Sequence, residues 1–492
     1  MGEVPSRQQD DNLQGEGETA FLLRFLGIAA IVGTLSFGLI ATLHWLVPDA
    51  VRAGSEPWPI EAWAGSLALS YLLVAGLLAL RRRNRLMTLL PLACVLLVGL
   101  FWLAFVRQTS QPRWDFGCFY RAGLAVRHGV NIYDVAAMQS YRYLYSPLLA
   151  TLFSAAEWLP DASRKLLAFW LWSIGNYWSL LLLLVLLAAA LRQYRVSGLY
   201  LWPALAAALL CNVPLQRTLI YSQPNLHVTN LILAFLLLYR RRPALAGVML
   251  AGAALLKTSP LLLLLPVLIE RRWRPVAGFL IGAGLLVGAS VAIVGPRPWL
   301  QFTHSLAITH SHGLYRDNSL QSLLINLGGL LHLPPQSFTL TLVSVAVTAA
   351  AAALLLALAF RPATRKLFVG GTEPRLLEGV LPFALAAMTI ASPRVWEHHW
   401  VFMLLPFCLL IARARGTQFL VPALLSYGLV FCVPTFDIFP LSYHHLAGLV
   451  WWAIIAVQLS AAHAIASETA EATIPDLSQQ FPASSPSGEL EI

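Results

Sequence analysis

The sequence predicts an all-α polytopic membrane protein. Hydrophobic residues make up 58% of its 492 residues and charged residues only 11%, whereas about a quarter of the residues in a soluble domain are charged. Apolar runs recur along the chain. Two of them, 21–46 and 338–360, reach the roughly 20 residues that an α-helix needs to cross about 30 Å of hydrocarbon.

The order of the apolar runs predicts about 12–14 transmembrane helices, the number depending on the two short runs that meet near residue 257. The expected spans are residues 21–46, 62–80, 86–106, 165–191, 199–213, 226–239, 244–256, 258–270, 276–294, 338–360, 376–391, 400–413, 418–434 and 445–465. The first run is longer than the apolar core of a signal peptide, which is about 7–15 residues. We therefore expect it to be an uncleaved span.

Arginine clusters predict the topology. They separate apolar runs at residues 81–85, 192–195, 240–242, 271–274, 361–366 and 413–415. With Arg375, these short segments hold 18 of the 33 Lys and Arg residues, and the much longer intervening loops hold 13. Because cytoplasmic loops carry an excess of basic residues, we expect these clusters and both termini in the cytoplasm of a plasma-membrane protein. The long loops 107–164 and 295–337 then face outward.

This topology places most of the polar chemistry on the outward side. Eleven of the twelve histidines, all except His463, fall there with Asp115, Asp134, Asp317 and Glu397. Neutral histidine escapes the positive-inside rule, which is a sufficient explanation for any single one of them. Connections between helices are usually short, however, and long ordered loops tend to carry function. We therefore expect the functional site on the outward side.

Several functional classes are disfavoured by the sequence. The net charge of +10 comes from short clusters between apolar runs, not from one basic face, so no nucleic-acid partner is expected. The five cysteines form neither a disulfide framework nor a CxxC pair. No P-loop, GxGxxG, HExxH or GxSxG motif occurs. A group-transfer enzyme that faces outward would lack cytoplasmic nucleotides, so its activated donor would have to be carried in the membrane.

The first outward loop contains "RWDFGCFYRAGLAVRHGVNIYD", in which "AGLAVRHG" is typical of a short amphipathic helix. Its aromatic content predicts a segment that lies on the membrane surface. Asp115 follows the span 86–106 closely and should lie near the interface. A solvated flanking acid would give the same pattern, so the alternative stays open.

Lys257 is expected at membrane depth, because the thirteen residues before it, 244–256, rise only about 20 Å as a helix. A buried ammonium needs water, a partner or an anion, which makes it a functional candidate; snorkelling is the structural alternative. Arg217, Tyr221, Gln223 and Asn225 fall on the same outward side. Together these side chains could hold a phosphate.

Two further outward segments carry candidates. "SPRVWEHHWVF" contains His398 and His399, which diverge on a helix and make a poor chelating pair. One of them could instead orient a carboxylate or share its proton. In the loop 295–337, Arg316 can pair with an anion and Asn318 can hydrogen-bond sugar hydroxyls.

The ordered motifs "DFxxFYxAG", "YSPL", "QPN", "AGVMLAGAALLKTSPLLLLL", "DNSLQSLL" and "SPRVWEHHW" resemble glycosyltransferase family 87 over roughly residues 86–415. The resemblance implies the GT-C membrane fold, with short amphipathic helices in the outward loops. The domains that it implies are a cytoplasmic tail 1–20, two extra helices in 21–85, a transmembrane catalytic domain 86–465 and a disordered cytoplasmic tail 466–492.

The resemblance also implies an activity and roles for residues. It predicts inverting, metal-independent transfer of a sugar, chiefly mannose and in some members arabinofuranose, from a polyprenyl-phosphate donor to a lipid-linked or glycan acceptor. No cofactor is expected. Asp115 matches the general base, and His398 or His399 matches the late histidine. Lys257, Gln223 and Asn225 match donor-side positions; the rest of the expected substrate-binding set is Tyr120, Arg217, Tyr221, Arg316 and Asn318. The chain departs from the pattern at Gly117 and Cys118, and has Ser222 where the family usually has glycine.

Three alternatives remain. A lipid or glycoconjugate transporter or flippase would also bury a lysine, but it predicts an internal repeat that the sequence does not show. A non-catalytic scaffold predicts that Asp115 can be changed without effect on glycoconjugates. A GT-C enzyme that acts on protein usually holds a divalent metal, and the first outward loop offers no DxD or ExD pair.

Overall fold

The computed structural model describes residues 42, 89–109, 112, 114–138, 143–196, 201–308, 311, 313, 317–334, 337–369, 376–414, 416–435 and 438–473. Across these ranges the chain is helical, and the β-type pairing is a single bridge between Asp317 and Trp396. This agrees with the predicted all-α class. The predicted tail 1–20, the span 21–46 apart from residue 42, the span 62–80, and the residues after 473 lie outside the described ranges.

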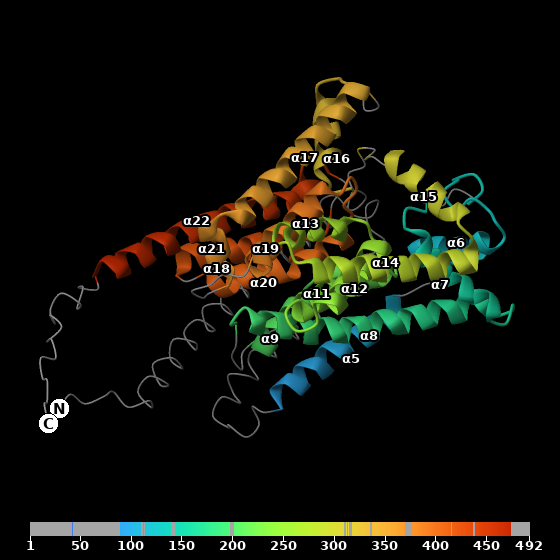
Figure 1. Ribbon diagram of the computed structural model, residues 1–492, viewed down its shortest axis with the longest axis horizontal. Helices are drawn as coiled ribbons and strands as arrows, with labels where there is room; N and C mark the ends of the chain where they lie inside the picture. The colour runs from blue at the N-terminus through green and yellow to red at the C-terminus, as the bar shows by residue number, and fades with distance from the viewer. Residues whose placement is uncertain are drawn as a thin grey trace, which may run out of the picture.

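The helices follow one another along the chain (Figure 1). They are α5 (Leu90–Thr109), α6 (Trp114–Arg127), α7 (Pro147–Ser154), η1 (Ala155–Trp158), α8 (Arg164–Gln193), α9 (Leu201–Leu210), α10 (Val213–Ile220), α11 (Asn225–Leu238), α12 (Pro243–Leu256), η2 (Ser259–Leu263), α13 (Leu264–Ile269), α14 (Trp273–Val294), α15 (Arg297–Ile308), α16 (Leu320–Leu330), α17 (Phe338–Phe360), α18 (Pro362–Val369), α19 (Leu376–Ala391), η3 (Glu397–Met403), α20 (Leu404–Arg413), α21 (Thr417–Tyr427), η4 (Gly428–Cys432), η5 (Leu441–Tyr443) and α22 (His444–Thr473).

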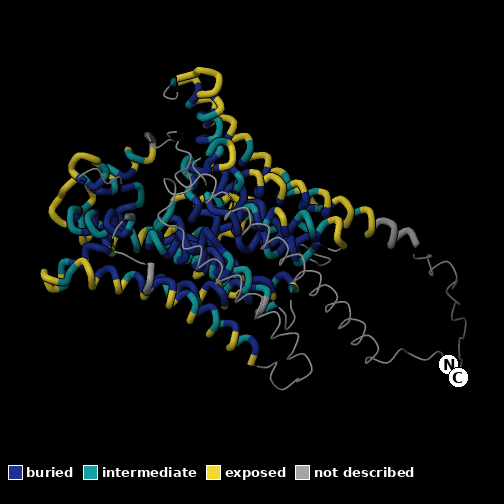
Figure 2. Tube along the Cα trace, turned by 180° about the vertical axis from the view of Figure 1, so that it is seen from behind, coloured by how far each residue is buried: buried dark blue, intermediate teal, exposed yellow. Residues whose placement is uncertain are grey.

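The helical lengths and composition are those of a membrane protein. Within the described residues, four segments are long and apolar enough to cross a bilayer, namely α8, α14, α17 and Leu441–Ala466. Seven other apolar helices have 10–17 residues. The apolar outer sides of α5, α8 and α17 are exposed, while the middle of the bundle is buried (Figure 2). Exposed apolar faces of this extent suit contact with lipid.

Some predicted spans are shorter or broken in the structure. The run 199–213 ends as a helix at Leu210, because Asn212 accepts a hydrogen bond from the Leu215 amide (2.8 Å) and caps α10 instead. The run 258–270 divides into η2 and α13. At the other end of the chain, α22 continues to Thr473, past the predicted end of the last span at residue 465.

Two glycines let α12 and α14 pack closely. A Cβ atom on Gly247 would lie 2.0 Å from the Pro275 carbonyl oxygen, and one on Gly278 would lie 1.9 Å from that of Ala244. Small residues at such crossings allow backbones to approach in a membrane, where van der Waals packing drives helix association. This contact fixes α12, which ends just before Lys257.

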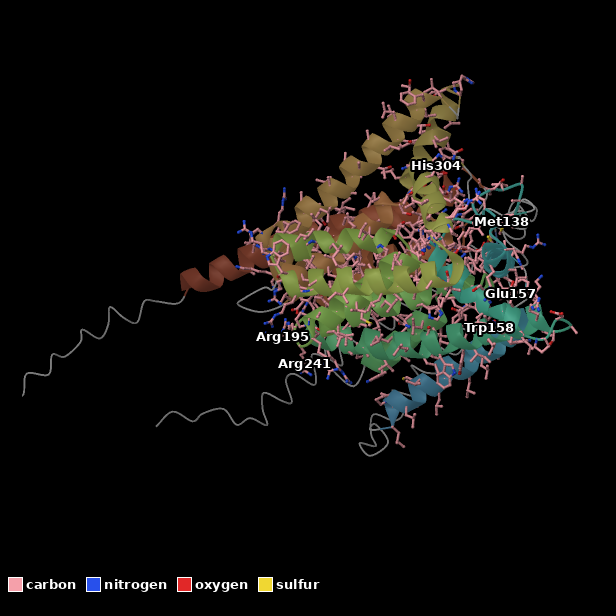
Figure 3. The ribbon with its side chains drawn as sticks, turned by 45° about the vertical axis from the view of Figure 1, so that its right-hand side comes forward. Met138, Glu157, Trp158, Arg195, Arg241 and His304 are labelled. Carbon is pink, nitrogen blue, oxygen red and sulfur yellow. The ribbon has the colours of Figure 1, made fainter. Side chains whose placement is uncertain are left out.

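The buried acid Glu378 connects several segments at one end of the bundle. Gln193 donates a hydrogen bond to Glu378 (2.8 Å), and Arg240 forms an ion pair with the same carboxylate. The arginine-rich segments gather there: Arg195 and Arg241 lie at one end of the molecule, and Met138, Glu157 and Trp158 lie at the other (Figure 3). The first long loop and the arginine-rich turns therefore occupy opposite ends.

At the far end, α6 and α7 form a small unit with its own apolar core. Phe116, Phe119 and Phe153 are buried in it. A Cβ atom on Gly123 would lie 2.5 Å from the Phe153 carbonyl carbon, so glycine permits the close approach of α6 to α7. This packing holds the start of α6, where Asp115 lies, against the main bundle.

Candidate functional site

Asp115 lies in the first turn of α6, where a carboxylate interacts favourably with the helix dipole. Its Oδ2 atom accepts a hydrogen bond from the Gln223 side-chain amide. Burial raises the pKa of Asp115 to about 6, and the Gln223 hydrogen bond and the Lys257 charge both oppose this rise. A carboxylate with a pKa near 6 suits a general base at neutral pH.

Gln223 is placed by the tight turn between α10 and α11. The preceding residue, Ser222, has a left-handed backbone with φ of 56°, a conformation that favours glycine. Its carbonyl accepts a hydrogen bond from the Trp172 indole (2.7 Å), which supports the turn from α8. The need for a left-handed residue explains why glycine would suit this position.

Lys257 lies at the break between α12 and η2, where the backbone becomes extended. Its Nζ atom donates a hydrogen bond to Asn225 Oδ1 (2.8 Å). The ammonium also lies 5.9 Å from the ring centroid of Tyr145 and 5.5 Å from that of Phe402, within cation–π range. Among the described residues no carboxylate forms an ion pair with it.

His398 and His399 lie in η3, with their ring centroids 4.6 Å apart. The His398 carbonyl accepts a hydrogen bond from Asn225 Nδ2 (2.8 Å), which connects η3 to Lys257. Burial lowers the pKa of both imidazoles, and the Lys257 charge lowers each further. Both rings are therefore neutral near pH 7 and do not add positive charge to the site.

Arg217 has a structural partner. Its Nε atom lies 2.8 Å from Glu397 Oε2, and both side chains are almost completely buried. Glu397 also accepts a hydrogen bond from the Thr435 amide (2.7 Å). The Tyr221 ring lies 6.1 Å from that of His398, and the Arg217 guanidinium lies 6.0 Å from its centroid. The ion pair offsets the charge of Arg217, which leaves Lys257 as the stronger candidate for binding an anion.

Residues 317–319 of the second long loop contact the segment before η3. Asp317 Oδ1 accepts hydrogen bonds from the Val395 amide (2.9 Å) and the Ser319 amide (3.1 Å). Asn318 is fully buried; its amide donates to the Ser442 carbonyl (2.9 Å) and accepts from Thr435 (3.1 Å). Both ends of the Asn318 amide therefore have partners within the protein, and its contact with a sugar hydroxyl stays a prediction.

One other predicted residue, Tyr120, lies apart from this cluster. It stacks on Phe116, with ring centroids 6.1 Å apart, and the charges that act on its hydroxyl are those of Arg164 and Asp161, in and just before α8. Arg316 lies outside the described residues. The side chains that the structure does bring together are those of Asp115, Arg217, Tyr221, Gln223, Asn225, Lys257, His398 and His399.

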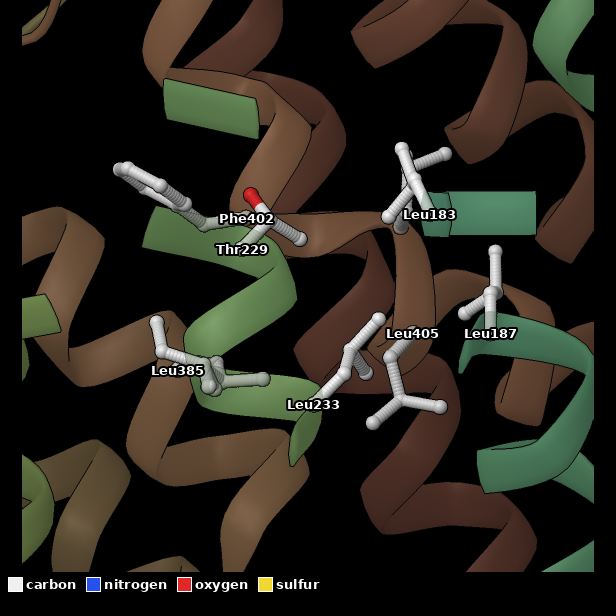
Figure 4. Close-up of a pocket in the computed structure, with 9 residues that line it drawn as sticks. Leu183, Leu187, Thr229, Leu233, Leu385, Phe402 and Leu405 are labelled. Carbon is white, nitrogen blue, oxygen red and sulfur yellow. The ribbon is translucent and has the colours of Figure 1, made fainter. Parts of the chain in front are cut away.

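An apolar pocket adjoins the cluster (Figure 4). It lies between α8, α11, α19 and the start of α20, and Phe402 and Thr229 are among its lining residues. The Thr229 hydroxyl donates to the Asn225 carbonyl (2.7 Å), and Phe402 also faces Lys257. Apolar side chains therefore lie directly beside the polar cluster.

The sequence analysis did not identify Tyr145 as a site residue, and it predicted no partner for Glu397. Tyr145 donates a hydrogen bond to Gln223 Oε1 (2.5 Å), and its position in the "YSPL" motif is the signal that could have found it. No spacing indicates that Glu397 pairs with Arg217, because 180 residues separate them. In the described part of the chain, no three His, Cys, Asp or Glu side chains are grouped so as to hold a metal ion.

Comparison with known proteins identifies the family. The model of glycosyltransferase family 87 matches residues 143–393, just over half of the chain. The chain belongs to glycosyltransferase family 87. It is also 26% identical over 349 residues to the polyprenol-phosphate-mannose-dependent alpha-(1-2)-phosphatidylinositol mannoside mannosyltransferase of Mycobacterium tuberculosis, a match that covers 64% of this chain and 75% of the relative. No solved structure matches the chain significantly.

These findings confirm the predicted family and identify a membrane glycosyltransferase of family 87. The matched range contains Lys257, Gln223 and Asn225 but ends before His398. Asp115 precedes it. The case for Asp115 therefore depends on its contact with Gln223 inside the matched range, not on the family match itself.

Proposed function

We propose that this family 87 member transfers a mannosyl group from a polyprenyl-phosphate donor to a hydroxyl of a lipid-linked or glycan acceptor, with inversion, on the outer face of the plasma membrane. The observation that carries the proposal is the joining of Asp115 and Lys257 in one cluster through Gln223, Tyr145 and Asn225. This arrangement supplies a base and a cation to the same reacting centre.

The proposed reaction is a single displacement. Asp115 removes the proton of the acceptor hydroxyl while that oxygen forms a bond to the anomeric carbon. The bond between this carbon and the phosphate oxygen breaks, and the polyprenyl phosphate leaves with the electron pair. A positioned base contributes about 100-fold to 10,000-fold, and the Lys257 ammonium stabilises the charge that grows on the phosphate.

The lipid-linked donor is proposed from the family and from a named relative. The Lys257 ammonium lies against Phe402 and could meet the phosphate of such a donor. Mannose is proposed because the Mycobacterium tuberculosis relative is named as dependent on polyprenol-phosphate-mannose, and a mannolipid acceptor because the same name specifies phosphatidylinositol mannoside.

The proposal includes the absence of a metal requirement, so addition of a chelator should leave the rate of transfer unchanged. The transporter alternative is not favoured, because the chain belongs to a glycosyltransferase family. Transport without transfer would leave the donor chemically intact.

The test supplies radiolabelled polyprenyl-phosphate mannose to membranes with and without this protein, and identifies the product by mass spectrometry. The expected product is a glycolipid or glycan that is one hexose heavier and that forms only with the protein. Formation of the product from a nucleotide sugar in the absence of the lipid-linked donor would contradict the proposal.

A further inference from the structure

The side-chain amide of Gln223 connects Tyr145 to Asp115 through two hydrogen bonds. The Tyr145 hydroxyl donates a hydrogen bond to Gln223 Oε1 (2.5 Å), and Gln223 Nε2 donates to Asp115 Oδ2. These contacts connect three segments that are far apart in the sequence: the start of α6, the strap of residues 143–146 before α7, and the turn between α10 and α11. Gln223 is 2% exposed, so water competes little for these bonds.

The chemistry of the three groups allows only one orientation of the Gln223 amide. An ionised carboxylate accepts hydrogen bonds and does not donate them, so the NH₂ end of the amide must face Asp115. The carbonyl end then faces Tyr145, whose hydroxyl donates to it. From the described residues, Asp115 Oδ1 accepts no hydrogen bond. Within the described part of the chain, one carboxylate oxygen of Asp115 is thus held by Gln223 and the other is left for a ligand.

Tyr145 is itself fixed from several sides. The Tyr133 hydroxyl donates to the Tyr145 carbonyl (2.9 Å), and the Tyr143 hydroxyl donates to the Ser146 carbonyl (2.8 Å). Ser146 also donates from its hydroxyl to the Leu255 carbonyl, two residues before Lys257. The strap is thereby attached to the end of α12.

The ring of Tyr145 lies beside the cation of the site. Lys257 Nζ is 5.9 Å from its centroid, and the Phe119 ring meets it edge-on at 5.0 Å. The Tyr145 ring thus lies beside Lys257. The Tyr145 hydroxyl binds the Gln223 amide, which in turn holds Asp115. A displacement of the strap would change the distance between base and cation.

We propose that Tyr145 and Gln223 are positioning residues for the general base: the Tyr145 hydroxyl orients the Gln223 amide, which holds Asp115 Oδ2 so that Oδ1 faces the acceptor hydroxyl. The inference rests on the proposed function and revises one of its details, because Gln223 was expected to bind the donor. Tyr145 sets the spacing between the base and Lys257.

The test measures kcat, KM for the lipid-linked donor, and the pH profile of kcat/KM. The charged and titratable groups that face Asp115 are Lys257, Tyr145 and, on its own helix, Cys118. Gln223→Glu keeps the size of the side chain but replaces the N–H donors by a second carboxylate. We expect it to raise the pH of the acid limb by at least about one unit and to lower kcat by about 10-fold to 100-fold.

Two further variants separate orientation from packing. Gln223→Leu removes the hydrogen bond without adding charge, so it should move the acid limb in the same direction by a smaller amount. Tyr145→Phe keeps the ring beside Lys257 and removes only the hydroxyl. We expect a lower kcat, an upward shift of the limb and an unchanged KM for the donor.

Tyr427→Phe is the control, because it removes one tyrosine hydroxyl, which donates to the Ala208 carbonyl (2.9 Å), without touching the strap or the amide chain. It should leave the acid limb at the pH of the unchanged enzyme. Unshifted limbs in Gln223→Glu and Tyr145→Phe, or a raised donor KM at constant kcat, would overturn the inference while transfer itself continues. Loss of the proposed function has a different signature: the unchanged protein would form no product, or Asp115→Asn would retain full activity.

Discussion

Asp115 is the residue on which the proposed chemistry depends most. Three influences act on its carboxyl group: burial raises its pKa, and the Gln223 hydrogen bond and the Lys257 charge lower it. Burial dominates and brings the pKa to about 6. The group is therefore mostly ionised at neutral pH but is still basic enough to accept a proton.

The pH dependence of transfer follows from this pKa. Below about pH 6 Asp115 is protonated and cannot act as a base, so kcat/KM should rise with pH through about 6 and then level off. The measurement is kcat/KM for a synthetic donor between pH 4.5 and 8.5 in detergent solution. A profile that stays flat across this range would show that a different group, or none, titrates in the free enzyme.

Ser222 gives a prediction about stability. Its left-handed backbone costs an L-residue about 1–2 kcal/mol, whereas glycine adopts it freely but has a more flexible unfolded state. Ser222→Gly should therefore leave the free energy of unfolding unchanged or raise it by up to about 1 kcal/mol.

Ser222→Val is the comparison variant, because a β-branched side chain tolerates this backbone poorly. It should lower the melting temperature of the detergent-solubilised protein, which the glycine variant should not. The reverse order would indicate that the serine side chain, not the backbone conformation, determines the stability of the turn.

At the scale of elements, the crossing of α12 and α14 determines where Lys257 lies. A Cβ atom on Gly278 would overlap the Ala244 carbonyl oxygen, whereas one on Gly284 in the same helix would meet no atom within 4 Å. Gly278→Ala should lower the free energy of unfolding by about 1–3 kcal/mol through overpacking.

Gly284→Ala should leave stability unchanged or raise it slightly, since alanine is the better helix former. Thermal unfolding of the two variants in the same detergent checks the pair. Equal effects at the two positions would mean that the close approach of the helices is not required.

The interface between α8 and α11 contains an unsatisfied buried amide. Asn176 is 2% exposed, and both ends of its amide lack a hydrogen-bond partner among the described residues. A buried polar group without partners costs about 1–3 kcal/mol. Asn176→Leu should therefore raise the thermal stability.

Asn230 supplies the matched control on the facing helix, because its amide nitrogen donates to the Ser179 carbonyl (2.7 Å). Asn230→Leu removes that bond and should lower the free energy of unfolding by about 0.5–1.5 kcal/mol. A loss of stability in Asn176→Leu would instead indicate that a bound water or another polar group satisfies the amide in the membrane.

Apolar periodicity predicted the positions of most helices but not their breaks. The interruptions at Asn212 and at Lys257 depend on a cap and on the backbone of single residues, which a hydropathy pattern averages over. The same holds for the end of α22, since the alanine-rich segment that follows residue 465 has enough helix propensity to extend the helix to Thr473.

At the scale of the whole molecule, the distribution of charge predicted which residues share one end of the bundle. The arginine-rich turns and the first long loop lie at opposite ends (Figure 3), and Asp115 and Lys257 lie in one cluster. The pairing of Arg217 with Glu397 and the role of Asn318 in the fold depend on contacts between distant segments. No spacing in the sequence encodes those contacts.

In the whole molecule, the surroundings of each cationic side chain near η3 indicate which of them could bind the proposed donor. Arg217, Lys257 and two histidines meet near η3, but Glu397 offsets Arg217 and burial keeps the histidines neutral. Lys257 lies where the polar cluster meets the apolar pocket. Among the described residues, Lys257 is therefore the cation of this cluster that has no ion-pair partner, and its charge acts on Asp115.

The most direct measurement is the kcat of purified protein for transfer from synthetic polyprenyl-phosphate mannose, compared among the unchanged chain, Asp115→Asn and Lys257→Met. Asp134→Asn is the control, because Asp134 is an exposed carboxylate of the loop 107–164 that also contains Asp115, and its hydrogen bonds are local. We predict that kcat falls by at least about 100-fold in the first two variants and stays within about two-fold in the control. A loss of only about two-fold in Asp115→Asn would contradict the assignment of this carboxylate as the general base.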